Sequence, residues 1–211
     1  MVSLHMPSPS SQPTHNEVPL TRDILRTVLD DLSIRILKVF GRPIQLIVHG
    51  GAVMILHPTL ASSTSRRTTR DVDFIRRSFV VEMDKMGVPD ADAKLQSCIN
   101  ATAAQYRLGA DWFNAHADIA LPMAQTFVSV HSFVAFVRAD VTAASPEGQP
   151  YDPIYSDSLK PNNVALNTIY RSPGLTLISV TMFWGVALKM VRYQKGAVMQ
   201  YKPGAVVDAE V

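Results

Sequence analysis

Two aspartates, Asp71 and Asp73, lie one residue apart in the stretch "RDVDFI". The stretch alternates polar and apolar residues, which predicts a half-buried strand. Side chains two residues apart on a strand point to the same face, so both carboxylates would share one side. Neighbouring carboxylates repel each other, and a divalent cation removes that repulsion. Mg²⁺ suits such a pair, because it is typically held by one or two carboxylates together with substrate phosphates.

A pair of glycines, Gly50 and Gly51, comes earlier in the chain, between the runs "PIQLIVH" and "AVMILH". The first run predicts a short strand that the glycines end, and the second predicts a helix that starts at them. Glycines let backbone amides approach a ligand closely, and the start of a helix favours an anion. The order of glycine turn and paired acids therefore favours a site that handles a nucleotide and a metal ion.

The charge of the chain is local, because the net charge is only +2 and gives no global basic field. Five arginines surround the aspartates: Arg66, Arg67, Arg70, Arg76 and Arg77. Arginine neutralises phosphate charge well, since its guanidinium is planar and permanently charged. A solvated loop is the alternative explanation of this cluster.

The segment resembles the nucleotidyltransferase superfamily, which has the DNA polymerase β-like fold, and "RTTRDVDFI" is similar to AbiEii-type bacterial toxins and related nucleotidyltransferases. The similarity covers residues 44–77 and, more loosely, residues 162–195. It implies transfer of a nucleotide from a nucleoside triphosphate to an RNA, protein or small-molecule acceptor, with Mg²⁺ or Mn²⁺. It also implies roles for residues of the chain: Gly50 and Gly51 at the phosphates, Arg67, Thr69, Arg70 and Lys189 as further nucleotide contacts, and Asp71 and Asp73 as metal ligands.

Two departures from that family concern the third acid and the end of the chain. The superfamily has a third carboxylate on a neighbouring strand, for which Asp118 is the first candidate and Asp140 the second. The family's late lysine is followed by an Arg-Asp-x-x-Asp stretch, whereas this chain has "YQKGAVMQYKPG". An inactive domain that binds a nucleotide or a partner protein is therefore an alternative. A structural domain in which the aspartates only edge a strand is another.

The remaining elements predict a mixed α/β (α+β) domain, in which a mixed sheet is flanked by helices. The run "PLTRDILRTVLDDLSIRILKVFG" predicts an amphipathic helix that Thr21 caps and Gly41 ends. "TLASSTSRRTT" predicts a loop, and another helix is expected from Asp90. "NNVALNTIYRSPGLTLISV" predicts two strands joined at the Ser-Pro-Gly turn 172–174.

The length of 211 residues suits one domain, which we expect at residues 18–195 with a nucleotidyltransferase-like fold. Residues 1–17 are rich in Ser, Pro and His and predict a disordered leader. Residues 124–150 are a possible insertion, and 196–211 an irregular tail. No apolar run reaches the roughly 18 residues that would cross a bilayer, so we expect a cytoplasmic protein without membrane contact.

Overall fold

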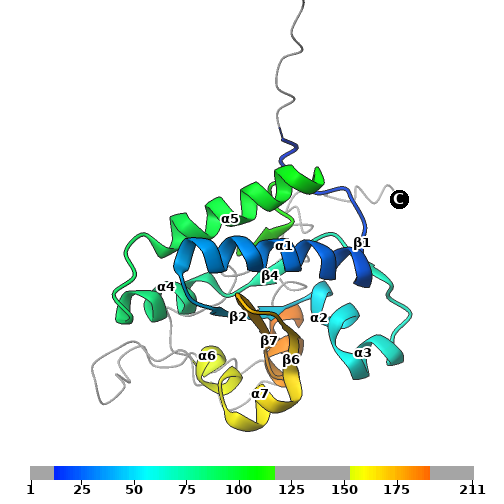
Figure 1. Cartoon of the computed structure of the whole chain (residues 1–211). Helices are drawn as coiled ribbons and strands as arrows, with labels where there is room; N and C mark the ends of the chain where they lie inside the picture. Colours follow the sequence, from blue (N-terminus) through cyan, green and yellow to red (C-terminus); the bar gives the residue numbers. More distant parts are fainter. Residues whose placement is uncertain (1–11, 117–152, 191–211) are drawn as a thin grey trace, which may run out of the picture.

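A computed structural model describes residues 12–116 and 153–190, and Figure 1 shows their arrangement. These residues form a mixed sheet with helices packed around it, which confirms the predicted mixed α/β class. The expected insertion at 124–150 and the expected tail at 196–211 lie outside the described residues. Within the described part, no helix combines the length and the apolar character needed to cross a membrane.

Among the described residues, the main sheet has five strands, and parallel and antiparallel pairs both occur in it. Strand β2 runs parallel to β7 and antiparallel to β4, while β4 runs parallel to β5 and β6 antiparallel to β7. In spatial order the strands are β5 (Phe113–Asn114), β4 (Val72–Phe74), β2 (Ile44–His49), β7 (Leu175–Ser179) and β6 (Thr168–Arg171). A separate two-stranded sheet pairs β1 (Leu20–Thr21) with β3 (Thr68–Thr69).

Helices lie on both sides of the sheet (Figure 1). The elements are α1 (Arg22–Phe40), α2 (Gly51–Leu56), α3 (Pro58–Ser63), α4 (Arg76–Lys85), α5 (Ala91–Tyr106), α6 (Pro153–Ser158), α7 (Pro161–Asn167) and a helical segment at 182–190. Successive side chains of β2 point to opposite faces of the sheet, so the strand contributes to two apolar clusters. Leu46 and Val48 belong to the cluster that includes residues of α1 and α5, whereas Ile47 belongs to a second cluster with Trp184.

Both ends of α1 are as predicted. The Thr21 hydroxyl accepts a hydrogen bond from the backbone N–H of Ile24 at 3.3 Å, and Gly41 ends the helix with a φ of 66°. The buried face consists of Leu25, Val28, Leu29, Leu32, Ser33 and Ile36. This spacing of three and four residues is the one that a helix with one buried side requires.

Two segments differ from the prediction because a proline begins a helix in each. The run after His57 was expected to be a loop but forms α3, with Pro58 in its first turn. The run "NNVALN" was expected to be strand but forms α7, with Pro161 in its first turn. Proline suits this position, since its missing N–H has no partner within the helix there. The predicted turn at 172–174 is confirmed, because Ser172 N donates to Leu175 O at 2.9 Å between β6 and β7.

Residues 12–17, which the sequence assigned to a disordered leader, belong to the described part of the chain, whereas residues 1–11 lie outside it. Pro13 O accepts a hydrogen bond from Ala110 N at 2.8 Å, and Asn16 is buried. Composition alone predicted disorder, because the segment has few apolar residues to bury. Its order comes instead from hydrogen bonds to residues that are distant in the sequence.

Replacement of Thr21 by alanine tests the cap of α1. We expect Thr21→Ala to lower the free energy of unfolding by about 1 kcal/mol, because the N–H of Ile24 loses its acceptor. Thr21→Ser keeps the hydroxyl and should stay close to wild type. Urea denaturation measures both variants, and equal losses in the two would contradict the capping role.

Candidate functional site

A pocket of about 560 Å³ lies at the carboxyl ends of β2 and β7. Its lining includes five of the residues singled out from the sequence: Gly50, Gly51, Asp71, Asp73 and Lys189. They come from the β2–α2 turn, from β4 and the residue before it, and from the helical segment 182–190. Chain segments that are far apart in the sequence therefore bring two carboxylates, a glycine turn and a lysine to one cavity.

The two aspartates differ in burial although both line the pocket. Asp73 is the middle residue of β4 and only 3% exposed, whereas Asp71 precedes the strand and is half-buried. In the sheet, Asp73 lies opposite His49 of β2 and beside Asn114 of β5. The shared direction of the two carboxylates is the geometry expected of residues two apart in extended backbone.

The backbone around the aspartates is held from both sides. Val72 N donates to Trp112 O at 2.8 Å, and Ile75 N donates to Ile47 O at 2.9 Å. The Thr69 hydroxyl donates to Asp71 O at 3.1 Å. Thr69, expected as a nucleotide contact, is buried and acts here on the backbone next to the carboxylates.

The glycine turn packs directly against these residues. Gly50 has φ 79° and ψ −146°, a conformation essentially confined to glycine, and a Cβ there would lie 2.6 Å from Asp73 Oδ2. A Cβ on Gly51 would collide with the Thr69 hydroxyl and would lie 2.7 Å from Arg66 Nη2. Close approach therefore favours glycine at both positions, and the backbone conformation adds a separate reason at Gly50. Helix α2 spans only six residues, so an anion here would depend on the amides and cationic groups of the turn region.

The arginine that faces the pocket is Arg66, and it is not one of the two to which the sequence assigned a nucleotide contact. Arg66 lines the cavity, and its Nε donates to Thr68 O at 3.0 Å. Arg67 instead donates to Thr64 O at 2.6 Å, at the end of α3. Arg70 is exposed and is held through its carbonyl, as described below. No periodic pattern distinguishes Arg66 from its neighbours, because residues 64–67 are irregular loop.

Lys189 is carried by a helical segment that a tryptophan anchors. Trp184 Nε1 donates to Asp157 Oδ2 at 2.8 Å, and Lys160 Nζ lies 2.7 Å from Asp157 Oδ1. Hydrogen bonds from Lys160 and Trp184 hold the pKa of Asp157 below its usual value, so this carboxylate is ionised at neutral pH. A charged acceptor strengthens the indole hydrogen bond, which fixes the helix that presents Lys189.

The pocket lining also includes apolar side chains and a hydrogen-bonded pair, His57 and Asn167. Met54, Leu166, Met182 and Val186 supply the apolar side chains. His57 Nδ1 accepts from the backbone N–H groups of Thr59 and Leu60, so its Nε2 carries the proton and donates to Asn167 Oδ1 at 3.1 Å. The sequence did not single out these residues for the site; Leu166 and Asn167 join it because α7 forms, and His57 lies at the start of α3.

The third carboxylate expected at the site is not among the described residues, since Asp118 and Asp140 both lie outside them. Within residues 12–116 and 153–190, no group of three His, Cys, Asp or Glu side chains could hold a metal ion. On β5, the residue beside Asp73 is an amide, Asn114, which donates to Asp111 O at 2.8 Å and accepts from His116 N at 2.9 Å.

Alanine at Gly50 tests the contact between the turn and Asp73. Gly50→Ala adds a methyl group against Asp73 Oδ2 in a backbone conformation that only glycine adopts readily, so we expect a loss of roughly 2–4 kcal/mol in the free energy of unfolding. Gly41→Ala is the matched control, because Gly41 also has positive φ but has nothing within 4 Å of its Cβ position. Its loss should be about 1 kcal/mol. Equal losses in urea denaturation would show that close packing at Gly50 adds nothing.

Comparison with known proteins returned no match to this chain, whether among protein-family models, curated proteins or solved structures. The function must therefore be inferred from the chemistry of the pocket. The lining groups that bear on it are two carboxylates, a glycine turn, Arg66 and Lys189, together with the apolar side chains of Met54, Leu166, Met182 and Val186.

Proposed function

We propose that the protein is a metal-dependent nucleotidyltransferase, which moves a nucleotide from a nucleoside triphosphate to a hydroxyl of an RNA, protein or small-molecule acceptor. One observation carries the proposal: Asp71, Asp73, the glycine turn and Lys189 line a single pocket. The resemblance in sequence assigns the same residues to metal and nucleotide. The cytoplasmic location expected from the sequence fits this activity.

The donor set suits Mg²⁺ or Mn²⁺. Asp71 and Asp73 both present oxygen ligands to the pocket, and Mg²⁺ commonly takes only one or two protein carboxylates when phosphates complete its coordination. The charge of the cation also offsets the unfavourable approach of two carboxylates. Asp71 and Asp73 would hold such an ion, which would supply positive charge to stabilise the charge that develops on the phosphates.

The other lining residues would bind either the phosphates or the base of the nucleotide. Backbone amides at Gly50 and Gly51, with the cationic Arg66 and Lys189, would bind the β- and γ-phosphates and neutralise the leaving pyrophosphate. The apolar side chains around Met182 would receive the base. A volume of about 560 Å³ lies within the usual range for a small-molecule site, roughly 300–1,000 Å³.

A second candidate is an inactive domain of the same kind, which binds a nucleotide without transferring it. The amide of Asn114 beside Asp73 favours this candidate, because a carboxylate on that neighbouring strand would be the expected third acid. In the active form of the proposal, Asp118 supplies the carboxylate that takes the proton from the acceptor hydroxyl. Activity therefore separates the two candidates, whereas nucleotide binding does not.

Replacement of Asp73 tests the proposal through transfer of label. Purified protein is incubated with each α-labelled nucleoside triphosphate, Mn²⁺ or Mg²⁺, and a pool of RNA and protein acceptors. We expect wild type to label an acceptor. In Asp73→Asn the rate of label transfer should be at least about 100-fold lower, because the variant removes a charged ligand from the metal site. Asp84→Asn, an equal change at an exposed carboxylate on α4, should keep wild-type activity.

The controls distinguish the possible results. Circular dichroism and urea denaturation should show that Asp73→Asn is folded. An equally active Asp73→Asn variant would refute the metal role. Absence of label, together with metal-dependent nucleotide binding that Asp73→Asn loses, would favour the inactive binding domain.

A further inference from the structure

The N-terminal segment, residues 12–19, forms no helix or strand and has one buried residue. Asn16 is 4% exposed, whereas its neighbours in this segment are exposed. A buried asparagine must satisfy both its amide donors and its carbonyl oxygen, or folding becomes less favourable. Its hydrogen bonds therefore identify what the segment holds in place.

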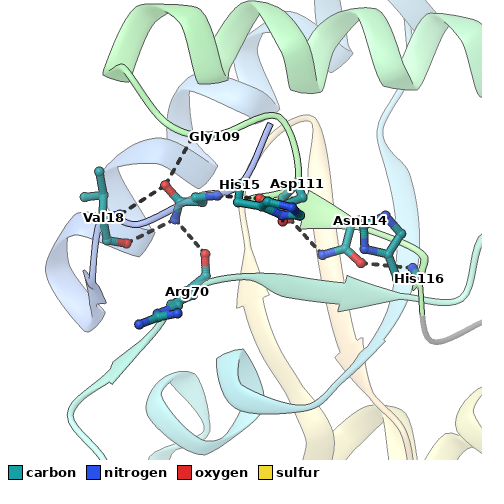
Figure 2. A network of polar contacts seen from close by, with 8 residues as sticks. His15, Val18, Arg70, Gly109, Asp111, Asn114 and His116 are labelled. Carbon is teal, nitrogen blue, oxygen red and sulfur yellow. Dashed lines mark hydrogen bonds and ion pairs between the residues drawn. The ribbon is translucent and has the colours of Figure 1, made fainter. Parts of the chain in front are cut away.

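Asn16 makes hydrogen bonds within its own segment and to two other parts of the chain, Arg70 and the loop that carries Gly109 and Asp111 (Figure 2). Its Nδ2 donates to Arg70 O at 2.6 Å and to Val18 O at 3.0 Å. Its Oδ1 accepts from Gly109 N at 3.2 Å. Its backbone N–H donates to Asp111 Oδ1 at 2.6 Å. Both donors of the side-chain amide are thus used, one of them on the peptide group that links Arg70 to Asp71.

The loop before β5 makes further hydrogen bonds that hold the aspartate segment, residues 68–74, in place. The Asp111 carboxylate accepts a hydrogen bond from the backbone N–H of Asn16, and the Asp111 carbonyl accepts one from the side-chain amide of Asn114. Asn114 is the strand neighbour of Asp73. Trp112 O accepts from Val72 N, between the two aspartates. The backbone on either side of Asp71 is therefore bonded to Asn16 and to Trp112.

The N-terminal segment and this loop are in close contact. A Cβ on Gly109 would collide with the backbone of His15 and Asn16. The His15 ring and Asp111 add an exposed contact of 2.9 Å between Nδ1 and Oδ2. Gly109 thus lets Asn16 come near enough to reach both the loop and Arg70.

We infer that Asn16 is a positioning residue, which fixes the aspartate segment so that Asp71 and Asp73 present their carboxylates together to the pocket. The inference rests on the proposed function for its purpose, although the tether itself is a physical property of the chain. A segment that served only to cover the loop would need bonds to Gly109 and Asp111 alone. The bond to Arg70 O reaches past the loop to the residue before Asp71.

Hydrogen exchange of the full chain tests the tether directly. In Asn16→Ala, amides of residues 68–74 should exchange about tenfold faster, because Arg70 O and Val18 O lose their donor. Asn16→Asp is the second variant, for use if Asn16→Ala impairs folding. It keeps an acceptor for Gly109 N but removes both side-chain donors, so amide exchange at residues 68–74 should again be faster. Ser33→Ala is the matched control, since Ser33 accepts hydrogen bonds from Gly174 N and Ser172 Oγ at the opposite end of the sheet.

The affinity for Mn²⁺ without nucleotide tests whether the hydrogen bonds of Asn16 support metal binding. It is measured from the electron paramagnetic resonance signal of the unbound ion. We expect about tenfold weaker binding in Asn16→Asp or Asn16→Ala and no change in Ser33→Ala. Unchanged exchange at 68–74 would overturn the inference. Faster exchange with unchanged Mn²⁺ affinity would also overturn it, because the tether would then be structural only. If wild type binds no Mn²⁺, the proposed metal site fails, and exchange at 68–74 alone decides whether Asn16 tethers the segment.

Discussion

The contact between Gly50 and Asp73 is the constraint on which the site depends. Antiparallel pairing of β2 with β4 places Asp73 opposite His49, and the carboxylate then reaches the turn that follows. The turn leaves no room for a side chain at Gly50, and its φ of 79° requires glycine independently. The contact therefore fixes Asp73, the turn and the start of α2 relative to one another. Together they supply a carboxylate and the glycine turn to the pocket.

A carboxylate buried to this degree has an energetic consequence. Transfer of an ionised group out of water is unfavourable unless charges or hydrogen bonds compensate for it. Asp73 shares the pocket with a second carboxylate, which adds to the unfavourable term, and with Arg66 and Lys189, which reduce it. An apolar residue at position 73 would suit a purely structural strand better. Departures of this kind from a locally stable choice are characteristic of functional sites.

The parts of the site that follow from local pattern could be predicted, and those that follow from irregular backbone could not. Alternation along "RDVDFI" places both aspartates on one face, and Gly50 ends β2 as expected. The choice of Arg66 over Arg67 depends on the path of residues 64–67, which no periodicity determines. Leu166 reaches the pocket from α7, a helix that proline begins in a stretch whose composition suggested a strand. The third acid lies outside the described residues, and that prediction stays open.

The N-terminal segment shows the same limit in a stronger form. Its composition predicts disorder, because nothing in it can build a core, yet one amide side chain anchors it across the fold. The hydrogen bond between Asn16 and Arg70 joins residues far apart in the sequence, so no local pattern predicts it. Metal and phosphate sites depend on the placement of their ligands to within a fraction of an ångström, and that placement is set by outer hydrogen bonds as much as by the ligands. An aspartate in the middle of a three-residue strand and another just before it need such support, since the strand is too short to hold them by its own pairing.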